Sequence, residues 1–176
     1  TTSKPKTVSL SQENIFSPAL NIIDTLELTS KDKCLNIMPL FHIHGLIGCV
    51  LSTILSGGTI ISSKGFNVLN FFSYIEIFKP SWFSAVPSMY KVIVKRKNKT
   101  LNDKKNIRFV RSSSAPITKE LIKEVEILFN CPLVEAYGMT EASHQITSNK
   151  FEKNQYKRNS LGKPHGVEVS VLTDNN

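Results

Sequence analysis

Short β-prone runs alternate with longer segments of helical periodicity along most of this chain, and this alternation narrows the available folds more than any other feature. The β-prone runs cover residues 34–38, 59–61, 81–86, 107–110 and 133–134, and the helical segments cover residues 11–28, 46–55, 67–78, 87–93 and 117–128. Such an order predicts parallel strands joined by right-handed crossovers. We therefore expect an α/β fold, with a largely parallel sheet flanked by helices on both faces.

The length and composition fit one domain with a sizeable core. The chain has 176 residues, of which 40% are hydrophobic, and its longest apolar run, Gly45 to Leu55, is too short to span a bilayer. Three widely separated cysteines lack the paired spacing of a zinc site, so we expect reduced core thiols. The chain starts without methionine or a signal peptide, and we therefore expect its first residue to be a cut and not a natural amino terminus. We expect an intracellular location, with cytoplasm and peroxisome both left open.

The formal net charge of +8 comes mainly from one segment. Between Lys91 and Arg108 the chain has eight Lys or Arg residues and a single acid, Asp103. A basic patch could bind nucleic-acid phosphates, but the segment lacks the glycine–aromatic motif of RNA-binding domains and lies in an Asn- and Lys-rich connection. We expect a solvated loop and no nucleic-acid partner, with a basic nucleic-acid-binding domain as the alternative.

The stretch from Val134 to Ala142 carries the clearest chemical signal, because an apolar run ends there in an aromatic residue, a glycine, a hydroxyl and a carboxylate. If the run is a buried strand, its carboxyl end delivers Tyr137, Thr140 and Glu141 into the crevice where open α/β sheets bind ligands. Tyrosine stacks on a flat ring, Gly138 lets a ligand approach the backbone, and a carboxylate beside a hydroxyl holds Mg²⁺ on a phosphate. The stretch indicates a nucleotide site; a core strand followed by an ordinary turn is the alternative.

Two further polar clusters follow other strands of the expected sheet. His42 comes after the first strand, and the small residues from Ser112 to Pro116 come after a later one. The carboxyl ends of parallel strands meet on one side of a sheet, so both clusters should share a crevice with Tyr137 to Glu141. A metal site at His42 and His44 would need a third ligand, and the sequence offers none nearby. A single imidazole lining the pocket is the expectation.

The first residues, Thr1 to Thr7, are rich in hydroxyls and lysines. Such a loop can wrap a polyphosphate, because hydroxyls and backbone N–H groups donate to phosphate oxygens and Lys6 adds a charge. The glycines of a Walker loop are absent, and a frayed polar terminus would look the same. Both interpretations stay open on these residues alone.

The order of these motifs resembles the adenylate-forming enzyme superfamily, the acyl-CoA synthetases in particular, over nearly the whole chain. Residues 1–6 are similar to that family's phosphate-binding loop, and residues 39–42 are similar to its aromatic acyl-pocket segment. Residues 113–116 are similar to its adenine-side turn, and residues 137–141 to its nucleotide and magnesium motif. Residues 160–164 are similar to the glycine–proline turn that follows. Residues 1–6 match only the second half of the phosphate loop. Among the five, the Tyr-Gly-Met-Thr-Glu match is the most specific.

Within the family, Pro39–Leu46 together with Glu135–Gln145 looks closest to the peroxisomal oxalate–CoA ligase-like branch. A small dicarboxylate would need cations or hydrogen-bond donors in its pocket. His42, His144 and Ser113 are candidate donors that a fatty-acyl tunnel does not require. Pocket-wall residues satisfied by the backbone are the alternative for these three. The resemblance implies an acid–CoA ligase, with oxalate as one candidate acid.

The resemblance also implies the reaction and the role of each residue. A carboxylate attacks the α-phosphorus of ATP to give acyl-AMP and pyrophosphate, and the thiol of coenzyme A then displaces AMP. As the catalytic pair, Thr140 is implied to donate to the α-phosphate and Glu141 to hold Mg²⁺. The residues implied to hold ATP are Thr1, Thr2, Ser3, Lys6, Ser114, Ala115, Pro116, Tyr137 and Gly138. The residues implied to border the acyl group are His42, Ser113, Gly138 and His144.

The chain departs from the family's pattern at both ends. The upstream half of the phosphate loop is missing, and Asn176 precedes the family's ribose-binding aspartate, its hinge and the small C-terminal domain with the adenylation lysine. We therefore expect residues 1–176 to be one incomplete domain, the central part of the AMP-binding domain, with little or no activity alone. Ser113 and Ser114 stand where many relatives have glycine. A non-catalytic module that only holds nucleotide or acyl-CoA is the alternative function.

Overall fold

The computed structural model describes residues 6–96, 106–151 and 160–173. Its strands are β1 (Lys33–Asn36), β2 (Thr59–Ser62), β3 (Trp82–Ala85), β4 (Phe109–Ser112), β5 (Leu133–Met139), β6 (His144–Ser148) and β7 (Lys163–Pro164). Its helices are α1 (Gln12–Leu26), α2 (Ile43–Gly45), the π-helical segment η1 (Leu46–Leu51), α3 (Ser52–Leu55), α4 (Val68–Phe78), α5 (Pro87–Lys95), α6 (Lys119–Phe129) and the 3-10 turn η3 (Thr140–Ala142). Strands and helices alternate as expected up to β5.

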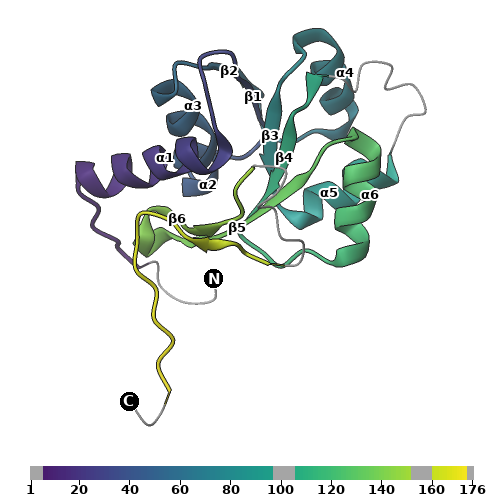
Figure 1. Cartoon of the computed structure of the whole chain (residues 1–176). Coiled ribbons are helices and arrows are strands. Elements are labelled where there is room, and N and C mark those ends of the chain that lie inside the picture. The colour runs from purple at the N-terminus through teal and green to yellow at the C-terminus, as the bar shows by residue number, and fades with distance from the viewer. Residues whose placement is uncertain (1–5, 97–105, 152–159, 174–176) are drawn as a thin grey trace.

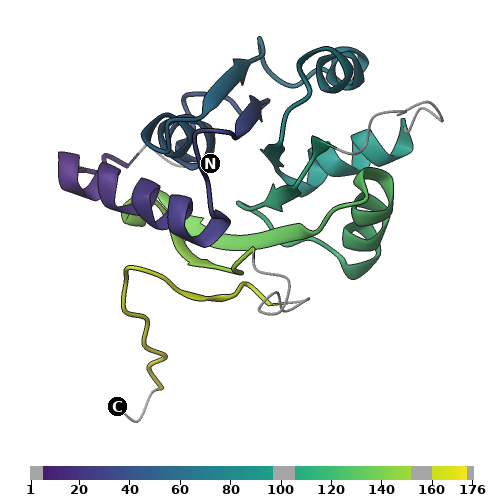
Figure 2. The same ribbon diagram turned by 45° about the horizontal axis from the view of Figure 1, so that its top comes forward.

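All described strands belong to one sheet, in the order β2-β1-β3-β4-β5-β6-β7 (Figures 1 and 2). The strands β2, β1, β3, β4 and the first half of β5 are parallel, whereas β6 is antiparallel to the second half of β5 and β7 is antiparallel to β6. The α/β fold with a largely parallel sheet is therefore confirmed. β5 does not end after Val134 but continues to Met139, because β6 takes over as its partner where the pairing with β4 stops.

Alternate residues of the parallel strands enter two separate cores. The core shared with α4, α5 and α6 includes the strand residues Leu35, Phe83, Val110 and Leu133. The core shared with α1 and η1 includes their neighbours Cys34, Trp82, Phe109 and Val134. This period of two buries both faces of the sheet, and Figure 1 shows α1 to α3 on one side of the strands and α4 to α6 on the other.

Several helices begin at residue types that favour a helix amino terminus. Ser11, Asn67 and Thr118 are the N-caps of α1, α4 and α6, and each side chain accepts a hydrogen bond from a backbone N–H of the first turn. Pro87 opens α5, a position where the missing N–H has no cost. The helix expected over residues 46–55 is present, but it passes through π geometry in η1. The three cysteines are buried and free, as expected.

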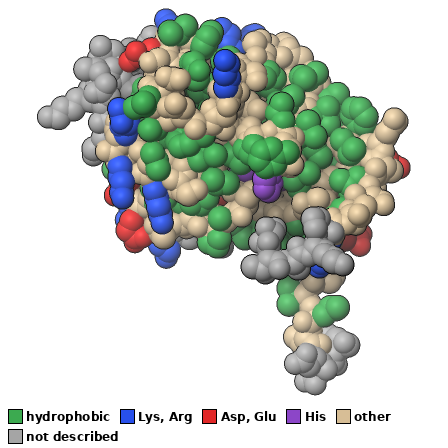
Figure 3. All heavy atoms as spheres, turned by 180° about the vertical axis from the view of Figure 1, so that it is seen from behind, with side chains coloured by type: hydrophobic (Ala, Val, Ile, Leu, Met, Phe, Trp, Pro, Cys, Tyr) green, Lys and Arg blue, Asp and Glu red, His purple; other side chains and the backbone are tan. Residues whose placement is uncertain are grey.

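Hydrophobic side chains cover much of the face seen from behind in Figure 3, and Lys and Arg side chains lie toward its left side and upper rim. Of the basic segment between Lys91 and Arg108, residues 97–105 lie outside the described part of the chain. The solvated loop expected there stays a prediction. No helix in the described ranges is both long enough and apolar enough to cross a membrane.

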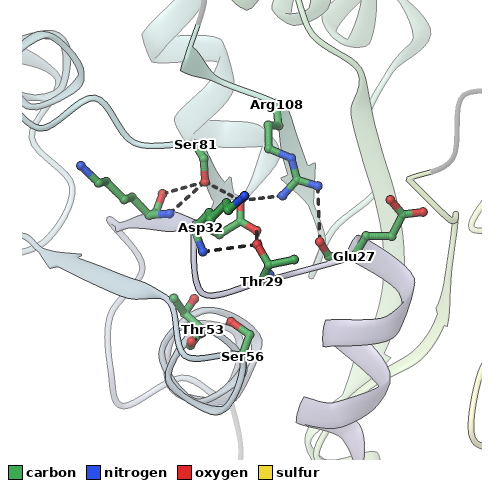
Figure 4. A network of polar contacts seen from close by, with 9 residues as sticks. Glu27, Thr29, Asp32, Thr53, Ser56, Ser81 and Arg108 are labelled. Carbon is green, nitrogen blue, oxygen red and sulfur yellow. Dashed lines mark hydrogen bonds and ion pairs between the residues drawn. The ribbon is translucent and has the colours of Figure 1, made fainter.

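At the amino ends of the strands, several chain segments meet at the buried carboxylate of Asp32 (Figure 4). Arg108, just before β4, pairs with Oδ1, and Ser81, just before β3, donates to the same oxygen at 2.7 Å. The backbone N–H of Thr29 donates to Oδ2 at 2.9 Å, and the carbonyl of Asp32 accepts from Thr59 at the start of β2. Burial by itself raises the pKa of Asp32, but these donors outweigh burial and lower the pKa.

Replacing Asp32 with asparagine should lower the free energy of unfolding by about 2–4 kcal/mol at pH 7, because the shape is kept while the charge opposite Arg108 is lost. A carboxylate whose pKa is lowered by folding stabilises the protein above its unfolded pKa and loses that contribution as the pH falls through its folded pKa. The penalty should therefore hold above pH 3.8 and shrink below it. Urea unfolding followed by the fluorescence of Trp82, the single tryptophan, measures the difference.

The matched control is Glu27→Gln, which neutralises an exposed carboxylate beside the same network. Only the backbone carbonyl of Glu27 accepts a hydrogen bond from Arg108 (Figure 4). This variant should change the free energy of unfolding by less than about 0.5 kcal/mol. Equal effects of the two substitutions would contradict a specific role for Asp32.

Candidate active site

Polar side chains gather where β3 and β4 end, on the face of the sheet that α1, α2 and η1 cover. This buried polar cluster consists of His44 in α2, Ser84 in β3, Arg111 in β4, Ser114 after β4, and His144 and Gln145 in β6. All of them except the exposed Ser114 have 2% or less of their surface accessible. Buried polar groups cost free energy unless they are hydrogen-bonded, so the partners of each residue define what the cluster can do.

One part of the cluster is a chain of hydrogen bonds that ends at the backbone carbonyl of Arg111. This carbonyl can only accept, and it receives the hydroxyls of Tyr90 at 2.8 Å and Ser84 at 3.2 Å. Ser84 Oγ in turn accepts from His44 Nε2 at 2.6 Å, which leaves His44 Nδ1 to accept from the hydroxyl of Ser114 at 3.0 Å. Ser114, at the end of this series of hydrogen bonds, has a φ of +72°, in the left-handed region that favours glycine.

The guanidinium of Arg111 forms the second part. Nη1 donates to His144 Nε2 at 3.0 Å, and Nη2 donates to Gln145 Oε1 at 3.0 Å. Gln145 Nε2 donates onward to Thr25 Oγ1 in α1 at 3.2 Å. Because arginine has no acceptor, the bond to His144 assigns Nε2 as the unprotonated nitrogen, and the proton of the neutral ring lies on Nδ1. The rings of His44 and His144 lie with their centroids 5.2 Å apart.

The cluster carries one positive charge and not three. Burial and, after it, the charge of Arg111 lower the pKa of His44 to about 3 and hold the pKa of His144 well below its ordinary value. Burial also lowers the pKa of Arg111, to about 10, so the guanidinium stays protonated at pH 7. Within the described ranges no carboxylate forms an ion pair with Arg111. Two neutral imidazoles thus accompany a cation that is not neutralised.

Two glycines make room for His144. A Cβ on Gly48 in η1 would lie 2.3 Å from His144 Nε2, and a Cβ on Gly138 in β5 would lie 1.5 Å from the carbonyl oxygen of His144. Both distances exclude a side chain. The pairing of β5 with β6 shifts register between Tyr137 and Gly138. Gly138 is therefore required for the contact between these two strands, independently of the ligand approach expected from the sequence.

The structure brings several of the expected site residues to this cluster. Ser114 and His144 are members of it, Gly138 lies against His144, and Ser113 is buried one residue before Ser114. The hydroxyl of Ser113 has no hydrogen-bond partner among the described residues. The adenine-side turn therefore meets α2, which follows the expected acyl-pocket segment, at the carboxyl end of β4.

Other expected residues lie at the surface around the cluster. Tyr137, Thr140 and Glu141 are exposed along the end of β5 and in η3, and Ala115 and Pro116 are exposed just after Ser114. His42 is exposed at the N-cap of α2, so its neighbour His44 enters the cluster while His42 stays at the surface. Lys6 is exposed, and Thr1, Thr2 and Ser3 lie outside the described residues.

Sequence reasoning did not single out His44, Arg111 or Gln145 as site residues. For Arg111 the strand pattern held the signal, because alternation places it on the same face as Phe109, inside a core. An arginine at such a position needs buried partners. His44 had no comparable signal, since its burial depends on the short helical turn that begins after His42.

A cavity of about 570 Å³ lies where the end of α1 meets β6 and β7, and Thr25, the hydrogen-bond partner of Gln145, is one of its lining residues. Its lining residues are Thr25, Ser148, Asn149, Lys150, Ser160, Gly162, Lys163, Pro164 and His165. None of the residues expected at ATP or at the acyl group lines it. The polar cluster and the exposed ends of β4 and β5 are therefore the candidate active site.

Comparison with known proteins gives one family. Residues 1–176 match the family model described as AMP-binding enzyme. The chain is 41% identical to the oxalate–CoA ligase of Saccharomyces cerevisiae, over 99% of this chain and 32% of that protein, and 35% identical to the oxalate–CoA ligase of Arabidopsis thaliana, over 99% and 35%. The o-succinylbenzoate–CoA synthetase of Bacillus subtilis, solved with ATP and magnesium, matches with a TM-score of 0.83 and 28% identity, over 99% of this chain and 36% of that one.

The chain spans about a third of the length of the curated relatives that it matches. Within that third the agreement is continuous, because the family model and both relatives cover essentially every residue from the amino end to the carboxyl end. The fold of the synthetase from Bacillus subtilis covers the same span. On this evidence the chain belongs to the family of AMP-binding enzymes.

Proposed function

We propose that the protein containing this chain is an AMP-forming acid–CoA ligase that acts on a short dicarboxylate such as oxalate. The support comes from the family match over the whole chain and from the similarity to two proteins named oxalate–CoA ligase. The observation that carries the proposal is the position of Tyr137 to Glu141 at the end of β5, beside the turn at 113–116 that follows β4. Open α/β sheets bind nucleotides at the carboxyl ends of their parallel strands, where these residues lie.

On the nucleotide side, Tyr137 stacks on adenine and the turn of Ser114, Ala115 and Pro116 faces it. All four residues are exposed, so a nucleotide can reach them. Thr140 donates its hydroxyl to the α-phosphate. Thr1, Thr2, Ser3 and Lys6 hold the β- and γ-phosphates in this proposal, with Lys6 supplying the charge.

The donor set fits a magnesium ion that arrives with ATP. No group of three or more His, Cys, Asp or Glu that could hold a metal occurs in the described ranges. Mg²⁺ commonly binds through one or two carboxylates together with substrate phosphates. The exposed Glu141, next to the hydroxyl of Thr140, offers such a carboxylate. When bound there, Mg²⁺ would neutralise charge on the phosphates.

On the acyl side, Ser113, His144, His42 and Gly138 border the substrate carboxylate. The hydroxyl of Ser113 is buried without a partner among the described residues, and a buried unpaired hydroxyl costs free energy. A substrate oxygen that accepts from Ser113 would remove that cost. Both steps of the reaction depend on positioning and charge neutralisation more than on a side-chain nucleophile, which suits this set of donors.

This chain supplies part of the site and not all of it. It covers about a third of its curated relatives. In this proposal, the adenylation lysine and the small C-terminal domain expected for the family lie in the rest of the protein. We expect the 176-residue chain alone to be inactive or nearly so. The experiments below therefore use the full-length protein.

Glu141→Ala in the full-length protein should reduce carboxylate-dependent release of pyrophosphate by at least about 100-fold, because Mg²⁺ on ATP loses its protein ligand. Raising the Mg²⁺ concentration should recover part of the loss. The control is Glu124→Ala, which removes an exposed carboxylate from α6 and should leave the rate unchanged. Normal turnover by Glu141→Ala would remove Glu141 from the metal site.

Ser113→Ala should raise the KM for the acid by about 10-fold while the KM for ATP stays the same, because only the acyl group loses a donor. Ser112→Ala is the matched control. Ser112 is also buried and its hydroxyl is also unpaired among the described residues, but strand alternation directs it toward the core of α4, α5 and α6. Steady-state kinetics with both substrates varied separates the two. Equal changes in both variants would show that Ser113 does not face the acid.

A further inference from the structure

We propose that Arg111 makes the enzyme select acids that carry a second negative charge, acting through the Nδ1–H of His144. This inference rests on the proposed function and adds a specificity-determining residue to it. Arg111 does not touch the reacting carboxylate in this account. It is a positioning residue that polarises and orients the imidazole of His144 and supplies an attractive field for the second anionic group.

The guanidinium of Arg111 has no anionic partner among the described residues. Arg111 is fully buried, and its hydrogen-bond partners, His144 and Gln145, are both neutral. Its Nε has no partner among the described residues. The nearest carboxylate in the neighbouring strand, Glu135, pairs in register with Ser112 and so lies on the other face of the sheet. A buried cation without a counter-ion is costly, and an anionic ligand is what would compensate it.

A structural role does not require the charge of Arg111. The two bonds that Arg111 makes to His144 and Gln145 connect β4 to β6, and neutral side chains can make such bonds. A buried positive charge without a counter-ion adds a desolvation cost to that role. An anionic ligand bound beside the guanidinium would offset this cost.

The direction of the hydrogen bond between Arg111 and His144 leaves His144, among the described residues, with a free donor. Arg111 donates to His144 Nε2, so the Nδ1–H of His144 is left as a donor, and no partner for it occurs within the described part of the chain. Gly48 packs against the Nε2 and Cδ2 edge of the ring, so Nδ1 points away from η1. An imidazole that accepts a hydrogen bond from a cation on one nitrogen is polarised, so it is a stronger donor at the other nitrogen.

The test compares oxalate with oxamate in the full-length protein. These acids have nearly the same shape, but oxamate carries a neutral amide where oxalate carries its second carboxylate. The wild-type protein should prefer oxalate in kcat/KM by at least about 30-fold, the discrimination expected of one buried charge interaction. Arg111→Met, which keeps the volume and removes the charge, should bring this ratio to within about 3-fold of unity. The loss should appear in the KM for oxalate.

Two further variants keep the experiment decisive if Arg111→Met does not fold. Arg111→Lys keeps the charge and should retain most of the preference for oxalate. His144→Phe keeps a ring of similar shape and removes the donor, and it should lose the preference as Arg111→Met does. Lys123→Met, which removes an exposed cation from α6, is the control that should leave the ratio unchanged.

The outcomes separate this inference from the function on which it rests. Equal losses for oxalate and oxamate in Arg111→Met and His144→Phe would overturn the inference and leave the ligase function standing. The same would follow from a wild-type protein that does not distinguish the two acids. Absence of pyrophosphate release with every acid would overturn the proposed function and the inference together.

The tautomer of His144 is an independent measurement. Two-bond ¹H–¹⁵N spectra of the full-length protein labelled at histidine should show the proton of His144 on Nδ1 and that of His44 on Nε2. Both rings should stay neutral down to pH 5, because their pKa values are lowered by burial and by the charge of Arg111. A proton on Nε2 of His144 would mean that Arg111 does not donate to it, which would remove the basis of the inference.

Discussion

The hydrogen bonds of Arg111 connect most of the elements that surround the candidate active site. The residue lies in β4, the middle strand of the described sheet. Its carbonyl accepts from Tyr90 in α5 and from Ser84 in β3, and its guanidinium reaches His144 and Gln145 in β6. One helix, α5, and two strands, β3 and β6, are therefore hydrogen-bonded to this residue. Hydrogen bonds to a charged group contribute about 1.5–3 kcal/mol each, so these bonds help to hold β6 against β4.

The two ends of the sheet use buried charge in different ways. At the amino ends, Asp32 has a cationic partner in Arg108 and donors from Ser81 and Thr29, so its charge is neutralised within the fold. At the carboxyl ends, Arg111 has only neutral partners among the described residues. The ion pair of Asp32 with Arg108 holds the strands together. The positive charge of Arg111 has no counter-ion among the described residues, and a bound anion can neutralise it. This division agrees with the rule that open α/β sheets bind ligands outside the carboxyl ends of their strands.

The local pattern of the sequence was sufficient for the parallel sheet, its two covered faces and the helix starts at Ser11, Asn67 and Thr118. The pairing of strands that are distant in the sequence could not be predicted from that local pattern. β5 continues past Val134 because β6 pairs with it, and nothing local to 133–139 encodes that partner. His42 and His44 share a face only in an extended segment, yet the chain turns helical at Ile43, so one ring is exposed and the other buried. Arg111 was visible in the strand pattern, but its partners come from β6.

The central claim is that the carboxyl ends of β4 and β5 form an adenylate-forming site for a short dicarboxylate. The exchange of labelled pyrophosphate into ATP by the full-length protein, without coenzyme A, tests it most directly because it reports the first half-reaction alone. We expect exchange that requires both Mg²⁺ and oxalate. The exchange should proceed without coenzyme A. Exchange that is independent of any acid, or no exchange with any short dicarboxylate, would contradict it.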